Sequence, residues 1–90
     1  MATKRFEKSF ALKEATETFL ALYEAFDPNI LCVEVYGDAV VEIRAQVMTK
    51  EDKLQFIQTA KSITTKGIEV ECYYHRAIRR YCIEIKWRLE

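Results

Sequence analysis

His75, the only histidine of the chain, stands three residues after Cys72, and this spacing occurs in zinc sites. A structural zinc ion takes four ligands, however, and the other two cysteines, Cys32 and Cys82, fall in separate predicted strands. No serine or cysteine stands beside His75 as a nucleophile that the imidazole could activate. We therefore predict no metal site and interpret His75 as a solvated turn residue.

Glutamates are a second group that could do chemistry, because Glu69, Glu71 and Glu84 fall close together on predicted strands. Paired carboxylates act as acid and base when their surroundings push their pKa values apart. Cross-strand ion pairs on a solvated sheet face explain them more simply. The chain has only two glycines, too few for a glycine-rich phosphate loop. The sequence therefore predicts no enzymatic activity, no catalytic residue and no cofactor.

The most basic stretch of the chain runs from residue 75 to residue 80. Its arginines could bind phosphates, and neighbouring tyrosines could stack on nucleic-acid bases. Tyrosine, tryptophan and arginine are also frequent anchors of protein interfaces. The candidate binding surface comprises Tyr73, His75, Arg76, Arg79, Arg80 and Trp87.

Two helices are predicted to position these residues. Apolar residues recur at steps of three and four between about Phe10 and Phe26, with Ser9 as N-cap and Asp27-Pro28 as the stop. The second helix follows Thr49, because Thr49 and Asp52 have the spacing of a capping box. The predicted core faces are Leu12, Ala15, Phe19, Leu22 and Phe26 in the first helix, and Leu54, Ile57, Ala60 and Ile63 in the second.

Two β-hairpins are predicted from runs of alternating apolar residues. Residues 30–36 and 39–47 form the first, and an odd-length turn, either the three residues 36–38 or five residues, keeps their apolar sides together. Residues 68–74 and 81–87 form the second, with an even turn over 75–78 or 76–77. The apolar side of this second hairpin is Ile68, Val70, Cys72, Tyr74, Tyr81, Ile83, Ile85 and Trp87.

The predicted fold class is α+β in the order α-β-β-α-β-β. One four-stranded, mainly antiparallel sheet carries two helices on one face, and two similar helix-plus-hairpin units suggest a pseudo-repeat. All 90 residues fit a single domain. We expect residues 1–8 to be frayed and residues 89–90 to be the remnant of a purification tag. The open sheet face is expected to hold five acids, Glu34, Glu42, Glu69, Glu71 and Glu84, against four bases, Arg44, Arg80, Lys86 and Arg88.

Composition narrows the choice of partners. Fourteen basic residues balance fourteen acidic ones, so no overall field attracts the chain to nucleic acid or to an anionic membrane. No apolar run is long enough to cross a bilayer, and the start shows no apolar signal region. Three cysteines make a poor disulfide framework and indicate a reducing compartment. We expect a cytoplasmic protein without a membrane partner.

Function is predicted from these exclusions together with the sheet edges. An antiparallel sheet has two edges with unpaired backbone groups, and no predicted strand contains a proline that would block pairing. We expect a non-enzymatic protein-binding module that forms homodimers and recognises or inhibits a macromolecular partner, such as a small accessory protein of a phage or another mobile element. An RNA- or DNA-binding regulator that uses residues 75–80 is one alternative, and a structural assembly subunit is another.

Overall fold

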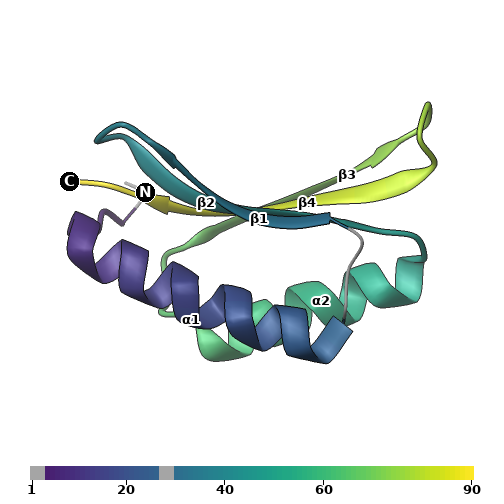
Figure 1. Ribbon diagram of the computed structural model, residues 1–90, viewed down its shortest axis with the longest axis horizontal. Coiled ribbons are helices and arrows are strands. Elements are labelled where there is room, and N and C mark those ends of the chain that lie inside the picture. Colours follow the sequence, from purple (N-terminus) through teal and green to yellow (C-terminus); the bar gives the residue numbers. More distant parts are fainter. Residues whose placement is uncertain (1–3, 27–29) are drawn as a thin grey trace.

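Two helices cover one face of a four-stranded antiparallel sheet, as the computed structural model shows for residues 4–26 and 30–90 (Figure 1). The sheet order is β1-β2-β4-β3, so β1 and β3 are the edge strands. This confirms the predicted α+β fold. In chain order the elements are α1 (Lys8–Phe26), β1 (Ile30–Tyr36), β2 (Val40–Val47), α2 (Lys50–Ile63), β3 (Glu69–His75) and β4 (Arg80–Arg88).

The first hairpin has an odd-length turn, as predicted, but the turn lies one residue later than expected. Tyr36 pairs with Val40, which leaves the three residues 37–39 in the turn. Gly37 has a φ of 55°, a backbone conformation that glycine adopts readily. Val33 pairs with Ile43, so the apolar sides of both strands face the helices.

The second hairpin has the predicted four-residue turn, again one residue later. His75 pairs with Arg80, and residues 76–79 form the turn. Arg79 is the non-glycine residue with a positive φ, 54°, among the described residues. Both turns bend away from the helices, which makes the open face of the sheet concave (Figure 1).

The helix boundaries largely match the prediction, but the buried faces do not. Thr49 caps α2 as predicted, because its hydroxyl accepts a hydrogen bond of 3.1 Å from the Asp52 amide. The first helix begins at Lys8 and not at Phe10, and the predicted stop at Asp27-Pro28 lies outside the described residues. The residues that α1 buries are Ala11, Glu14, Ala15, Thr18 and Leu22, and those that α2 buries are Phe56 and Ala60.

Three predicted core residues therefore lie on the surface: Leu12, Leu54 and Ile63. In α2 the three-residue spacing of Leu54, Ile57, Ala60 and Ile63 causes this, because each step falls about 60° short of a full turn and the set winds around the helix. In α1, apolar residues cover such a wide arc that their pattern alone does not fix the direction of the core.

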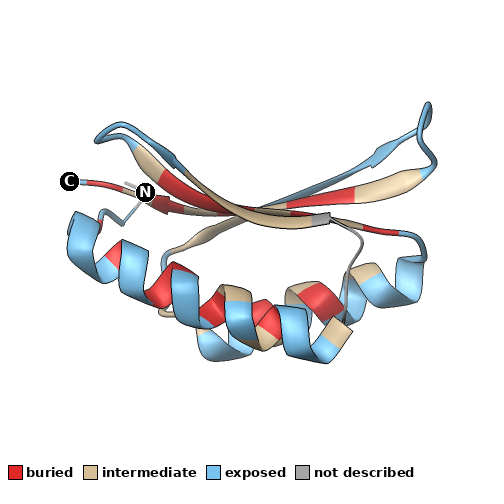
Figure 2. Cartoon of the chain, viewed as in Figure 1, coloured by how far each residue is buried: buried red, intermediate tan, exposed pale blue. Residues whose placement is uncertain are grey.

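The core lies between the sheet and the helices, where β2 and β4 supply half of the buried apolar side chains (Figure 2). Both ends of the described chain belong to it. Phe6 is 4% exposed and Leu89 3%, and the Phe6 amide donates a 2.8 Å hydrogen bond to the Arg88 carbonyl. The expectation that residues 1–8 are frayed is therefore wrong for Phe6, and Leu89 packs as a core residue.

Candidate functional site

The open face of the sheet carries a network of ion pairs. Arg44 on β2 lies at its centre, near three carboxylates: 3.2 Å from Glu84, 3.6 Å from Glu42 and 4.0 Å from Glu34. Lys86 lies 3.2 Å from Glu71 and 3.4 Å from Glu84, and Arg88 lies 2.6 Å from Glu69. The five predicted acids thus pair with three of the four predicted bases, Arg44, Lys86 and Arg88, whereas Arg80 forms no ion pair among the described residues. Each exposed pair adds roughly 0.2–1 kcal/mol to stability.

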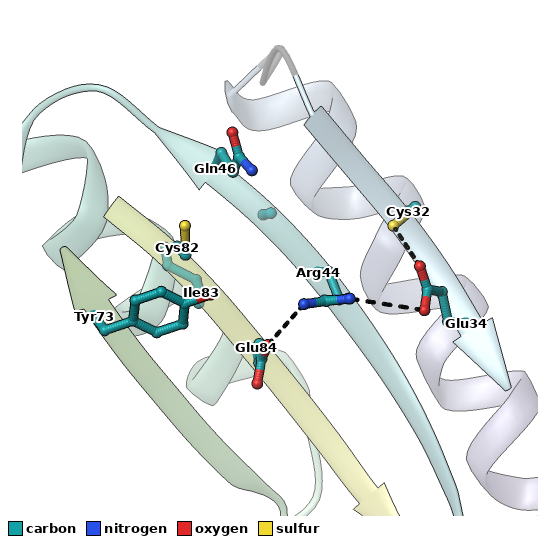
Figure 3. A pocket seen from close by; sticks show the side chains of 9 residues that line it. Cys32, Glu34, Arg44, Gln46, Tyr73, Cys82, Ile83 and Glu84 are labelled. Carbon is teal, nitrogen blue, oxygen red and sulfur yellow. Dashed lines mark hydrogen bonds and ion pairs between the residues drawn. The ribbon is translucent and has the colours of Figure 1, made fainter. Parts of the chain in front are cut away.

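A shallow hollow of about 260 Å³ lies on this face beside Arg44 (Figure 3). Its charged groups are already paired with one another, because Arg44 contacts Glu34 and Glu84, and the Cys32 thiol lies 3.7 Å from a Glu34 oxygen. Ligand sites of drug-sized molecules usually have about 300–1,000 Å³ and polar groups free to orient the ligand. The hollow therefore has few groups to offer a small molecule.

The thiols of Cys32 and Cys72 are unsuited to nucleophilic chemistry. Burial and the neighbouring Glu34 raise the pKa of Cys32, and burial raises the pKa of Cys72 although Lys53 opposes the shift. A raised pKa keeps a thiol protonated at neutral pH, whereas the thiolate is the nucleophile and metal ligand. Among residues 4–26 and 30–90, no three His, Cys, Asp or Glu side chains come together in a metal-binding group.

The basic segment forms the exposed end of the second hairpin, farthest from both chain termini (Figures 1 and 2). We call residues 73–80 the arginine hairpin. It brings together five of the six predicted surface residues, namely Tyr73, His75, Arg76, Arg79 and Arg80. Apolar surface lies among them, because Tyr73 is 47% exposed, Tyr74 48% and Ile78 45%.

The three arginines of this hairpin differ from the bases of the sheet. Arg44, Lys86 and Arg88 all form ion pairs, whereas within the described part of the chain Arg76, Arg79 and Arg80 form none. Their guanidinium groups keep their donors free for a partner. An arginine can bind a carboxylate or a phosphate through two parallel hydrogen bonds, so this end of the molecule suits an anionic group.

Trp87 does not belong to the candidate surface, and its prediction is corrected. It lies near the other end of β4 and is fully buried against Val41 and its core neighbours. Alternation along the strand explains this position, because Trp87 has the same parity as Tyr81, Ile83 and Ile85 and therefore faces the helices. The aromatic character of the residue suggested an interface anchor, while its parity indicated the core.

The sequence analysis missed an uncharged side of α1. Leu12, Leu20 and Tyr23 are 37%, 53% and 52% exposed, and Thr16 and the half-buried Phe19 lie between them. The steps of three and four along this set were visible in the sequence, but the predicted core face included only Leu12 and Phe19 from it. We call Leu12, Thr16, Phe19, Leu20 and Tyr23 the uncharged flank of α1.

Comparison with known proteins finds no matching family model, no similar curated protein and no similar solved structure. Neither described helix is long and apolar enough to span a membrane.

Proposed function

We propose that this chain is a non-enzymatic, self-associating protein-binding module that holds an acidic segment of a partner protein at the arginine hairpin. The observation that carries the proposal is the set of three arginines without ion pairs beside exposed Tyr73, Tyr74 and Ile78. Arginine and tyrosine are enriched among the residues that dominate interface energies. An acidic partner with apolar residues would cover both the charges and the aromatic rings.

The surroundings of the hairpin favour a protein over a nucleic acid. Glu71 is exposed on β3, two residues before Tyr73, and Glu69 precedes it on the same face. Glu71 pairs with Lys86 and Glu69 with Arg88, so the sheet beyond the hairpin has no free base at these positions for a phosphate backbone that continued along it. A protein segment needs only a short acidic stretch, and it can cover Ile78 and Tyr74 with apolar side chains.

The test removes the three charges without disturbing the turn. In the variant Arg76→Gln/Arg79→Asn/Arg80→Gln, asparagine suits the positive φ of residue 79. The control Lys13→Gln/Lys61→Gln/Lys66→Gln removes the same charge from exposed positions elsewhere. A partner is captured from nuclease-treated lysate of the source cell, purified and titrated by calorimetry. We expect the hairpin variant to weaken its affinity by about tenfold or more and the control to leave it unchanged.

Nucleic acid is the second candidate, because the same free arginines and tyrosines could bind phosphates and bases. Short single- and double-stranded DNA and RNA are titrated by calorimetry at rising salt concentrations. Binding by a few phosphate contacts would weaken steeply as salt increases. If oligonucleotides bind tightly through these arginines and nuclease abolishes partner capture, the protein-binding proposal is wrong.

A further inference from the structure

We propose that two copies of this chain associate through one specific edge, with β1 pairing antiparallel to β1 and the uncharged flank of α1 packing against its copy. This inference rests on the proposed self-association and names its surface. The result would be a continuous eight-stranded sheet with four helices on one face.

The uncharged flank of α1 faces away from α2. At 100° per residue, its five residues centre on the side of the helix opposite Glu14. Glu14 accepts hydrogen bonds from the amide and the hydroxyl of Thr65, just beyond the end of α2. The flank therefore lies on the outer side of α1, below the free edge of β1 (Figure 1).

Strand β1, which lies above this flank, has few features that would prevent it from pairing with another strand. Its outer edge has no neighbouring strand among the described residues, so alternate amides and carbonyls of residues 30–36 lack sheet partners. Glu34 is the only charged residue of β1, and its carboxylate is held on the open face by Tyr36, Arg44 and the Cys32 thiol. Edge strands usually carry lysine, proline or inward charges that block further pairing, and β1 has none of these within it.

The strand is self-complementary in one register. A two-fold axis through Val33, the middle of the seven residues, pairs the whole strand with its copy. On the helix side Leu31 then faces Val35 of the second copy, and on the open side Cys32 faces Glu34 of the second copy. An axis through Glu34 would instead place two carboxylates directly opposite each other, which is unfavourable.

The helices fit this arrangement. Strands in a sheet lie about 4.8 Å apart, and α1 contacts both β1 and β2, so its axis lies about half a strand spacing inside β1. Pairing β1 with its copy would therefore place the two α1 axes roughly 10 Å apart, close to the usual distance of packed helices. Apolar side chains of the flank would fill the space between them.

The area is also sufficient. A seven-residue strand is about 23 Å long, and the molecule measures 25 Å from the hairpin turns to the helices. With the full height of the molecule as its depth, a patch of this length on each copy buries on the order of 1,000 Å² in total, about the minimum expected of a specific interface. A second copy matches the length and the uncharged character of the patch along its whole extent.

The test places charges on the flank and measures the mass in solution. Sedimentation equilibrium of the parent over a wide concentration range should give twice 10.6 kDa. Leu20→Glu/Tyr23→Glu should raise the dissociation constant of the dimer at least about 100-fold, because the interface would bury unpaired carboxylates. Leu54→Glu is the matched control, since Leu54 is 55% exposed and Leu20 53%, but on the other helix. It should leave the dimer intact.

A second variant and a second readout make the result independent of one substitution. Val35→Lys places a charge on β1 at a position that is 43% exposed. This variant should also be a monomer by sedimentation equilibrium, and its circular dichroism should show that it is folded. In the parent, amide hydrogen exchange in β1 should slow as protein concentration rises, while exchange in β3 should not change. Any one of four results would overturn the proposal. These are a parent that stays monomeric, a flank variant that dimerises like the parent, a Leu54→Glu control that dissociates, and slowed amide exchange in β3 instead of β1.

The assignment of the arginine hairpin and the inference about β1 can be tested independently of each other. The variant Arg76→Gln/Arg79→Asn/Arg80→Gln should remain a dimer and lose the partner, whereas the flank variant should be a monomer whose single site still binds the partner. If the parent is monomeric and the arginine variant still loses the partner, the proposed self-association and the inference about β1 are both wrong, and the assignment of the arginine hairpin stands. A dimer that keeps its partner after removal of the three arginines would overturn only the assignment of the arginine hairpin.

Discussion

The two edge strands of the sheet, β1 and β3, are each seven residues long and each pairs antiparallel with a central strand, yet they differ in charge. Strand β1 has one charged residue, and the helix beside it presents an uncharged flank. Strand β3 has two glutamates, Glu69 and Glu71, and lysines lie below it. Lys53 stacks over the Tyr81 ring at 5.1 Å, and Lys61 lies beside Val70 in a shallow surface pocket.

This difference indicates how association stops at two copies. If both edges were uncharged, chains could add at each side of the sheet and form an open-ended polymer. Lys53 and Lys61 below β3 form no ion pair among the described residues, so pairing at that edge would be costly because it would bury these charges without partners. In the proposed assembly, one uncharged edge per chain and a two-fold axis would therefore produce a closed dimer.

The largest expected effect comes from making β3 resemble β1. The variant Glu71→Thr/Lys53→Leu/Lys61→Leu removes charges from the β3 side, and we expect assemblies much larger than a dimer, detected by light scattering. The control Glu71→Asp/Lys53→Arg/Lys61→Arg keeps each charge and should remain dimeric. If the neutralised variant also stays dimeric, charge is not what distinguishes the two edges.

A moderate effect on the free energy of unfolding is expected from loss of the contact between Glu14 and Thr65, which fixes the rotation of α1 about its axis. Glu14 is 8% exposed, and its carboxylate holds Thr65. Glu14→Ala leaves the Thr65 amide without this partner, and we expect a loss of about 1–3 kcal/mol in the free energy of unfolding by urea. Glu17→Ala, at an exposed position of the same helix, should change it by no more than about 0.5 kcal/mol.

Both Glu14 measurements are made at one protein concentration, because dimerisation contributes to apparent stability. Equal unfolding free energies for the two variants would show that Glu14 does not fix α1 against the loop after α2. The rotation that turns the uncharged flank outward would then need another cause.

The smallest expected effect is on the pKa of Tyr36, and it comes from Glu34, the single charged residue of β1. The Tyr36 hydroxyl donates a hydrogen bond to Glu34, and this bond raises the pKa of Tyr36 to about 12. Because the folded value exceeds the ordinary value of 10.0, the stabilising contribution is complete below about pH 10 and is lost as the pH rises through about 12. Glu34→Gln should therefore let Tyr36 ionise at lower pH, as followed by phenolate absorbance.

Tyr73 on β3 is the internal control for this titration, because contact with Cys82 is the main cause of its raised pKa. Its ionisation should be the same in Glu34→Gln and in the parent. The dimer should also persist in this variant, since β1 would then carry no charge at all. Superimposable titration curves for the two proteins would contradict the role assigned to Glu34.

The sequence predicted the elements and the strand faces because these depend on local features. Alternation of apolar residues fixed which side of each strand meets the helices, and Thr49 with Asp52 marked the start of α2. The arginine hairpin was also visible as a basic segment between two strands. Each of these features is defined by residues close together in the chain.

What the sequence did not reveal depends on contacts between distant residues. The rotation of α1 depends on Glu14 and Thr65, which are 51 residues apart. The burial of Phe6 depends on its bridge to Leu89 across nearly the whole chain. Leu12 of the uncharged flank was mistaken for core because an apolar residue on a helix looks the same in sequence whether it faces the sheet or the surface.

Trp87 gives the protein an intrinsic optical reporter. It is the single tryptophan of the chain and fully buried, and its Nε1 has no hydrogen-bond acceptor among the described residues. Indole emission shifts to longer wavelength when water reaches the ring, so it should respond to unfolding. Trp87 lies seven residues from Arg80, about 23 Å along β4, so contact at the arginine hairpin should leave its emission unchanged. The emission spectrum therefore distinguishes a variant that has lost its partner from one that has lost its fold.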